Sequence, residues 1–457
     1  MSTVFNTSIA MFIPLGIGLS LILIIFRKSR LGPSLSLALA YGLGLGVLTL
    51  WMVFLTIVDI PFTVMTTGLP ILAAMFTPAY ICRKKTGLGT LLFIKQMPND
   101  KRPLDLIVLL LLAYVTFYMM YVFWTALNIP VHVWDEIERV AFKAKIFYTQ
   151  RSIMQLKYLP HPSYPVLIEL AVTWLTLNLQ SWNDQVIKII IPFFFLFYSI
   201  IHFSFLKNFT NTRWALGGVA LLAVSPLLIH HATMLYVDLP LMFYNCSAII
   251  LLLIWDMRKE DSYLFLASLF AGLASFTKVE GAFYFIIYFI LLIFLLSDNT
   301  TYPLKKKVRS FVKFAIPCLT IFLFFFLYKA HAEITLVERA GYDFSLENLN
   351  RLPVIIEAFI RNLFLSGNWS IVWLILILSI VHIERIIKIK QVRLLLLCLL
   401  LYFGILFVIF LMTPIYYWIS YDKAYGVLAR LILHFYPISA LLIILLNCPL
   451  SAKNATS

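Results

Sequence analysis

Charged residues are scarce in this sequence, and their scarcity excludes most soluble architectures. Only 12% of the 457 residues are Asp, Glu, Lys or Arg, whereas 62% are hydrophobic, and the mean hydropathy is +0.94. A soluble domain cannot bury so much apolar surface, so the composition indicates a polytopic membrane protein. A chain of this length accommodates roughly a dozen spans of about 20 residues each, together with their loops.

Paired cysteines and glycine-rich nucleotide motifs are also lacking. None of the cysteines forms a CxxC pair, and all lie in or beside apolar runs: Cys82, Cys246, Cys318, Cys398 and Cys448. They indicate buried thiols rather than a disulfide framework or a metal site. No GxGxxG segment follows a strand and no P-loop occurs, which argues against a nucleotide-binding glycine-rich loop.

Apolar stretches and basic loops together predict an all-α, polytopic transmembrane helix bundle of about 13 spans. The stretches are 8–26, 35–57, 66–82, 104–127, 185–206, 214–233, 236–255, 263–277, 280–297, 312–330, 368–387, 394–416 and 427–447. Basic residues gather in alternate loops, including 27–30, 83–85, 305–309 and 385–393. By the positive-inside rule these loops face the cytoplasm and the N-terminus faces out. The net charge of +15 is therefore a topology signal, which argues against nucleic acid as a partner.

We expect three regions along the chain. Residues 1–103 form accessory transmembrane helices and a cytoplasmic linker, 104–447 form the main transmembrane domain, and 448–457 form a short cytoplasmic tail. The main domain has two long outer loops, 128–184 and 331–367. Apolar residues at helical spacing between 137 and 148 predict an amphipathic helix, and a second apolar stretch at 166–179 is too short to span. We expect both helices to lie in the membrane interface.

Polar residues collect at the outer ends of the spans. Asp135 and Glu136 follow an apolar run directly, behind Trp134. The others are His161 and Tyr164; His230, His231, Tyr236 and Asp238; Lys278 and Glu280; Arg430 and His434. Ionisable residues at such depth are costly and tend to mark sites. Carboxylates next to Lys and Arg side chains suit a reaction in which a general base activates a hydroxyl group. In such a reaction Lys and Arg bind the phosphate that leaves.

Each of these residues also has an ordinary structural interpretation. Asp238 could cap a helix that starts at Leu239-Pro240, and the Asp135-Glu136 pair could mark a helix start. Lys278 and Glu280 could form a solvated turn, His230 and His231 could pack locally, and Arg430 could extend to the interface. Taken singly, none of the residues decides between the two interpretations.

Taken together and in order, these segments resemble the GT-C superfamily of integral-membrane glycosyltransferases. The likeness is to its bacterial branch related to protein mannosyltransferases and lipid A aminoarabinose transferases, and it covers roughly 104–447. It rests on residues 134–136 (Trp-Asp-Glu), 141–145 (Ala-Phe-Lys-Ala-Lys), 161–165 (His-Pro-Ser-Tyr-Pro), 236–240 (Tyr-Val-Asp-Leu-Pro), 271–281 (Ala-Gly-Leu-Ala-Ser-Phe-Thr-Lys-Val-Glu-Gly) and 429–437 (Ala-Arg-Leu-Ile-Leu-His-Phe-Tyr-Pro).

The resemblance implies an enzyme that moves a sugar, with inversion, from a polyprenyl-phosphate donor to a lipid, glycan or protein acceptor outside the cytoplasm. It further implies a multi-pass protein of the bacterial plasma membrane, in contact with membrane lipid and active in cell-envelope glycosylation. The resemblance implies that Asp135, or its neighbour Glu136, is the general base. It implies that Asp238, His161 and Tyr164 line the acceptor or metal region, and that Lys278, Arg430 and His434 bind the donor phosphate. Glu280 and Trp134 would support these residues. No cofactor is fixed, and a divalent cation (Mg²⁺ or Mn²⁺) remains an option.

Two departures from the family pattern leave alternatives open. Three extra spans precede the first outer loop, and no large soluble domain exists to bind a bulky acceptor. The rival functions are a transporter or flippase for a lipid-linked saccharide, and a ligase that uses the late outer loop with Arg339 and Arg351. Which of Asp135 and Glu136 takes the proton, and which sugar and acceptor are used, is open at this point.

Overall fold

The computed structural model describes residues 2–27, 31–86, 105–298, 302–334, 345–413, 416–419 and 426–449. Over these ranges every regular element is a helix and no strand occurs, which confirms the predicted all-α fold there. Most of the cytoplasmic linker, Arg339 and residues 450–457 of the tail lie outside the described residues.

The α-helices follow in chain order. They are α1 (Ser2–Ile25), α2 (Pro33–Ile57), α3 (Val64–Thr67), α4 (Leu69–Thr86), α5 (Leu106–Asn128), α6 (Phe142–Gln150), α7 (Leu167–Leu179), α8 (Ile190–Leu206), α9 (Thr212–Val224), α10 (Pro226–Thr233), α11 (Asp238–Arg258), α12 (Asp261–Thr277), α13 (Glu280–Phe283), α14 (Phe285–Ser297), α15 (Leu304–His331), α16 (Leu352–Ile360), α17 (Val372–Ser379), α18 (Ile383–Lys388), α19 (Lys390–Met412), α20 (Tyr416–Ile419), α21 (Val427–Leu433) and α22 (Tyr436–Asn447).

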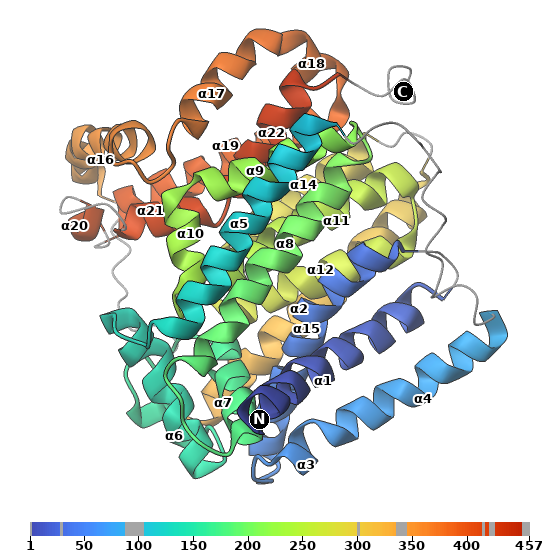
Figure 1. Cartoon of the computed structure of the whole chain (residues 1–457). Helices are drawn as coiled ribbons and strands as arrows, with labels where there is room; N and C mark the ends of the chain where they lie inside the picture. The colour runs from blue at the N-terminus through green and yellow to red at the C-terminus, as the bar shows by residue number, and fades with distance from the viewer. Residues whose placement is uncertain are drawn as a thin grey trace.

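Many of these helices can cross a membrane. In the described ranges eight are long and apolar enough, and up to ten if each of two bent pairs counts as one span. The bent pairs are α9 with α10, at 75°, and α21 with α22, at 50°. The predicted multi-pass membrane character is confirmed. The long helices run in one general direction across the molecule (Figure 1).

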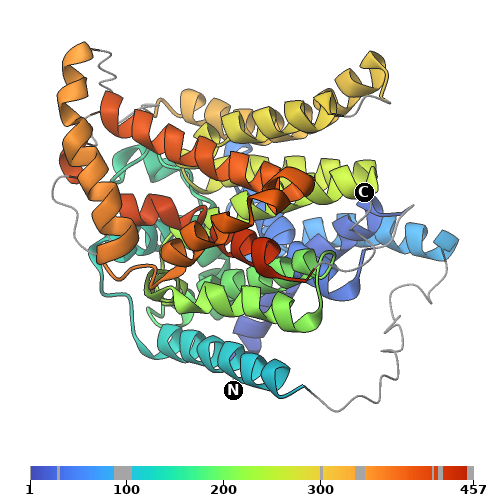
Figure 2. The same ribbon diagram turned by 90° about the horizontal axis from the view of Figure 1, so that it is seen from above.

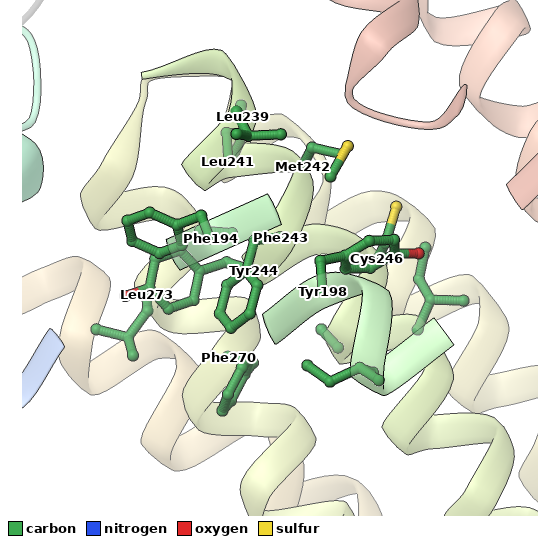
Figure 3. Close-up of a cluster of buried hydrophobic side chains, with 14 of the residues drawn as sticks. Phe194, Tyr198, Leu239, Leu241, Met242, Phe243, Tyr244, Cys246, Phe270 and Leu273 are labelled. Atoms are coloured by element: carbon green, nitrogen blue, oxygen red, sulfur yellow. The ribbon is translucent and has the colours of Figure 1, made fainter. Parts of the chain in front are cut away.

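Helix α11 forms the centre of the bundle. Its residues from Asp238 to Asp256 are all buried, as expected of a helix that is apolar on every side. Phe243 and Tyr244 pack against Phe194 of α8 and Phe270 of α12, with ring centroids 5.2 to 5.9 Å apart (Figure 3). This core fixes the N-terminal end of α11, where Asp238 lies.

Helix α5, by contrast, lies at one edge of the bundle, as the view from above shows (Figure 2). Only Val122, Thr125 and Ala126 of its 23 residues are buried. A helix this apolar with so little protein around it is suited to contact lipid. Its C-terminal end leads directly into the segment 128–184, predicted to be the first outer loop, which carries Asp135.

The N-terminal helices pack closely on one another and on the rest of the chain. A Cβ on Gly44 of α2 would lie 1.7 Å from the backbone oxygen of Pro14 in α1, so only glycine allows this approach. The Tyr41 hydroxyl donates to the Ile190 carbonyl at 2.9 Å, and Tyr244 donates to the Gly42 carbonyl at 2.8 Å. Helix α2 is thereby joined to both α8 and α11.

The first outer loop is helical where expected, but one of its helices does not lie in the interface. Helix α7 is buried along all 13 residues and packs against α1, α2 and α6. The Trp174 indole donates to the Ala10 carbonyl of α1 at 2.8 Å. The expectation that α7 lies in the interface is wrong, because the N-terminal helices and α6 cover its surface.

Candidate functional site

Asp238 is the centre of a buried polar cluster at the N-terminal end of α11. Its side chain is completely buried, and four nitrogen atoms bond to it. Oδ1 accepts from Lys278 Nζ at 2.9 Å and His434 Nε2 at 3.0 Å, and Oδ2 accepts from Arg430 Nη2 at 2.9 Å and Nε at 3.0 Å. Asp238 is the first residue of α11 rather than its N-cap, which is Val237. The carboxylate therefore acts as a shared counter-ion.

Arg430 links this buried carboxylate to Asp135, 295 residues away in the sequence. Its Nη1 donates to Asp135 Oδ2 and forms an ion pair with it. The guanidinium also lies 4.9 Å from the centre of the Tyr236 ring, a cation–π contact. Of its five N–H groups, three are used by the two carboxylates. Arg430 is held by Asp238 and Tyr236 and directed toward the first outer loop.

Asp135 lies at the open edge of the cluster, with 20% of its side chain exposed. Arg139, one turn further on, places its Nε 3.4 Å from Asp135 Oδ1. The Arg139 guanidinium in turn lies 5.2 Å from the centre of the Tyr164 ring, and His161 and Tyr164 meet edge to face. The structure thus brings the His161–Tyr164 segment beside Asp135, while the neighbouring Trp134 is 71% exposed.

Glu136 has the opposite environment, although it is the next residue. Its side chain is fully buried and accepts the backbone N–H groups of Leu235 at 2.6 Å, His132 at 3.1 Å and Val133 at 3.3 Å. Lys188 Nζ, itself 1% exposed, lies 3.3 Å away. Successive helical residues point in different directions, so the two carboxylates cannot share one task. Glu136 ties the first outer loop to the segment before α11.

Lys278 and Glu280 form the turn between α12 and α13. Lys278 is 5% exposed and its Nζ lies 2.9 Å from both Asp238 Oδ1 and Glu280 Oε1. Lys278 is thus a buried partner of Asp238, whereas Glu280, 25% exposed, reaches the edge of the cluster.

His434 lies beneath Asp238 and continues the hydrogen-bond network inward. Because a carboxylate only accepts, His434 Nε2 carries the proton that it shares with Asp238. Its Nδ1 lies 2.7 Å from the Tyr284 hydroxyl, which is 3.0 Å from the Tyr402 hydroxyl. Tyr402 donates to the Leu431 carbonyl. His434 is completely buried, so it positions Asp238 and does not reach the open edge.

The described residues do not fit a divalent cation at this site. Mg²⁺ and Mn²⁺ need several oxygen ligands, and here both Asp238 oxygens already face nitrogen donors. The described ranges also hold no group of three or more His, Cys, Asp or Glu residues that could bind a metal ion. Arg430 lies between two carboxylates and forms an ion pair with each, while Arg139 and Lys278 supply the remaining positive charge.

The electrostatics of the site edge follow from burial and from these pairings. Burial raises the pKa of Tyr236 to about 12, although the Arg430 cation beside it acts in the opposite direction. Tyr236 therefore keeps its hydroxyl proton at neutral pH. The charges of the cluster balance: Asp135, Asp238 and Glu280 against Arg139, Lys278 and Arg430.

The helix breaks that bring these residues together follow from the local sequence. Ser225 caps α10 by accepting the Leu228 N–H at 3.2 Å, and Pro226 begins that helix. Pro437 lies in the first turn of α22, just after His434. Proline favours a helix start and disfavours continuation of the helix before it. The bends therefore fall within the two bent spans, and the second places His434 at the break, beside Asp238.

Sequence reasoning missed Lys188, Tyr284 and Tyr402 as parts of this network. Lys188 had a usable signal, because it is a lysine at the start of a strongly apolar span. The tyrosines had none, since tyrosine is common throughout this sequence. No protein-family model matches this chain, and comparisons with curated proteins and with solved structures also gave no match.

Proposed function

We propose that this protein is a membrane glycosyltransferase that moves a sugar from a polyprenyl phosphate to an acceptor hydroxyl on the non-cytoplasmic side. The observation that carries the proposal is the arrangement around Arg430. One guanidinium joins a buried carboxylate, Asp238, to an edge carboxylate, Asp135, at the outer ends of the spans. In this proposal Asp135 is the base and Arg430 is the phosphate-binding cation, and the two side chains form an ion pair.

Asp135 is the general base in this proposal. It is the partly exposed member of the acidic pair, whereas Glu136 is buried with its oxygens occupied. The acceptor hydroxyl gives its proton to Asp135 as its oxygen bonds to the anomeric carbon. The bond between that carbon and the donor phosphate breaks, and the electron pair leaves with the phosphate. Attack opposite the leaving group inverts the anomeric centre.

Arg430 stabilises the departing phosphate, and Lys278 with His434 keeps Asp238 fixed behind it. Charge that develops in the transition state is stabilised best by donors already held in place. Arg430 meets this requirement, because Asp238 binds its Nε and Nη2 and Tyr236 stacks on it. The lipid chain of the donor stays in the bilayer, so only its head group has to reach the outer ends of the helices.

The test is turnover by the purified protein in detergent. The protein is incubated with candidate polyprenyl-phosphate sugars and acceptors, and released polyprenyl phosphate is measured. We expect release by the wild type and none by Asp135→Asn. Asp105→Asn is the matched control, because it also breaks an Asp–Arg pair, with Arg213, but at the cytoplasmic end of α5. Near-normal turnover by Asp135→Asn would exclude Asp135 as the base, and transport of intact donor without release would favour a flippase.

A further inference from the structure

Arg430 is already occupied in the structure, and this bears on how a donor binds. Within the described part of the site, the three acids and three bases around Asp238 leave no net positive charge. Two of the five Arg430 N–H groups bind neither carboxylate, but because the described cluster has no surplus positive charge, a phosphate that binds this guanidinium competes with the carboxylates for its charge. Two carboxylates, Asp135 and Asp238, are the candidates.

Asp238 is the fixed partner. It is fully buried, it accepts two of the Arg430 N–H groups, and it also binds Lys278 and His434. Its removal from Arg430 would leave several buried groups without partners, which is costly. Asp135 receives only Arg430 Nη1, lies at the edge, and has a second partner in Arg139. Asp135 is therefore the carboxylate that can exchange.

We propose that the donor phosphate replaces Asp135 on Arg430, so that donor binding itself releases the base. The proposal rests on the proposed function and goes beyond it by assigning an order of binding. Before the donor arrives, the Asp135 carboxylate is held by Arg430 and is not available to an acceptor. The phosphate takes over the N–H groups on that side of the guanidinium, a planar donor that suits phosphate as well as carboxylate.

The released carboxylate has a defined place to go. Arg139 remains beside Asp135 Oδ1 at 3.4 Å and lies over the Tyr164 ring. Exchange on Arg430 therefore leaves Asp135 tethered on the side of the His161–Tyr164 segment. The exchange turns the base from the donor phosphate toward the segment where we place the acceptor hydroxyl.

The charges of the transfer step balance under this arrangement. The phosphodiester of the donor carries one negative charge and leaves as a phosphomonoester with two. The proton taken from the acceptor hydroxyl removes the negative charge of Asp135. Arg430 thus faces a growing phosphate charge while the carboxylate that competes for it becomes neutral. A productive acceptor complex forms only after the donor is bound.

The experiment measures binding rather than turnover. The probe is farnesyl phosphate, a short polyprenyl phosphate, and its Kd for detergent-solubilised protein is determined by microscale thermophoresis. We expect Asp135→Asn to bind the probe about tenfold more tightly than the wild type or better, because the competing charged hydrogen bond is lost. We expect Arg430→Gln to weaken binding of the probe. We also expect the double variant Asp135→Asn/Arg430→Gln to bind the probe no more tightly than Arg430→Gln alone. Asp105→Asn and the uncharged alcohol farnesol are the controls and show no such change.

Each result has a distinct meaning. If Arg430→Gln weakens binding but Asp135→Asn does not tighten it, the exchange is refuted while the proposed function stands. If the wild type binds farnesyl phosphate no better than farnesol, the proposed function itself fails. Size-exclusion elution and thermal unfolding show whether each variant is folded. If Arg430→Gln does not fold, Arg430→Lys is used instead. In the Arg430→Lys background, Asp135→Asn must then tighten probe binding less than it does in the wild type, because a lysine cannot bind Asp238 through two nitrogens and also reach Asp135.

Discussion

Replacing Glu136 by glutamine tests whether the Glu136 carboxylate stabilises the fold while the Asp135 carboxylate is the proposed general base. Glutamine has the same shape, but one carboxylate oxygen becomes an NH₂ group. Oε1 accepts the Leu235 N–H and lies beside Lys188, whereas Oε2 accepts the His132 and Val133 N–H groups. Whichever oxygen is replaced, the new N–H group faces a backbone N–H group, and Lys188 loses its counter-ion.

The size of the effect follows from burial. Removing one partner of a buried ion pair costs about 3–5 kcal/mol, since the other charge is left uncompensated. The side chains of Glu136 and Lys188 are 0% and 1% exposed, so this range applies to Glu136→Gln. Asp135 is 20% exposed and Arg430 keeps Asp238 as a partner. We therefore expect Asp135→Asn to change stability by no more than about 1 kcal/mol.

The assay is unfolding of the purified protein by titration with sodium dodecyl sulfate in mixed micelles, alongside the turnover assay. Glu136→Gln must lower the free energy of unfolding, and Asp135→Asn must abolish turnover at nearly normal stability. The double variant Glu136→Gln/Lys188→Met removes both charges and should recover much of the lost stability, because a buried pair and an apolar replacement are often close in free energy. Normal stability of Glu136→Gln together with lost turnover would refute the division of roles and make Glu136 the base.

Two further predictions concern packing and pH. Gly44→Ala should destabilise the protein by about 1–3 kcal/mol, because the new Cβ would meet the Pro14 carbonyl of α1. Gly404→Ala in α19 should not destabilise the protein, because the space around Gly404 is open. The free energies of unfolding of the two variants are compared in mixed micelles. Burial raises the pKa of Glu169 in α7 from 4.5 to about 7, against the effect of Lys143. The folded state thus keeps a proton that the unfolded state releases, so stability falls between pH 4.5 and 7, by up to about 3 kcal/mol, and is level above pH 7. The stability difference between Glu169→Gln and the wild type should follow this curve, and a constant difference over that range would contradict it.

The sequence was informative about the apolar spans because these depend on local composition. Runs of apolar residues are long compared with the loops between them, so helices such as α5, α8 and α19 could be predicted directly. The positions of Asp135, Asp238 and Arg430 at span ends also came from local sequence. Their pairing did not, because it depends on how three distant helices pack.

Two features lay beyond the sequence for the same physical reason. The burial of α7 depends on α1 and α2, which cover it, and nothing in residues 167–179 reports on those neighbours. The different roles of Asp135 and Glu136 depend on Leu235 and Lys188, which provide the buried pocket for one carboxylate only. Periodicity places a side chain on a helix face, but the partner of that face is a property of the folded chain.

The bent spans beside the site are relevant to whether the protein is a transferase or a transporter. Broken helices and buried charges are features of transporters, which bind cargo near the middle of the bilayer. Here His434 lies at the break between α21 and α22, Arg430 lies within α21, and Asp238 is the first residue of α11. These groups also bind one another, since Arg430 and His434 both donate to Asp238. Among the described residues the cluster is self-paired and partly exposed at Asp135 and Glu280. Release of the phosphate product is therefore the measurement that best separates the two functions.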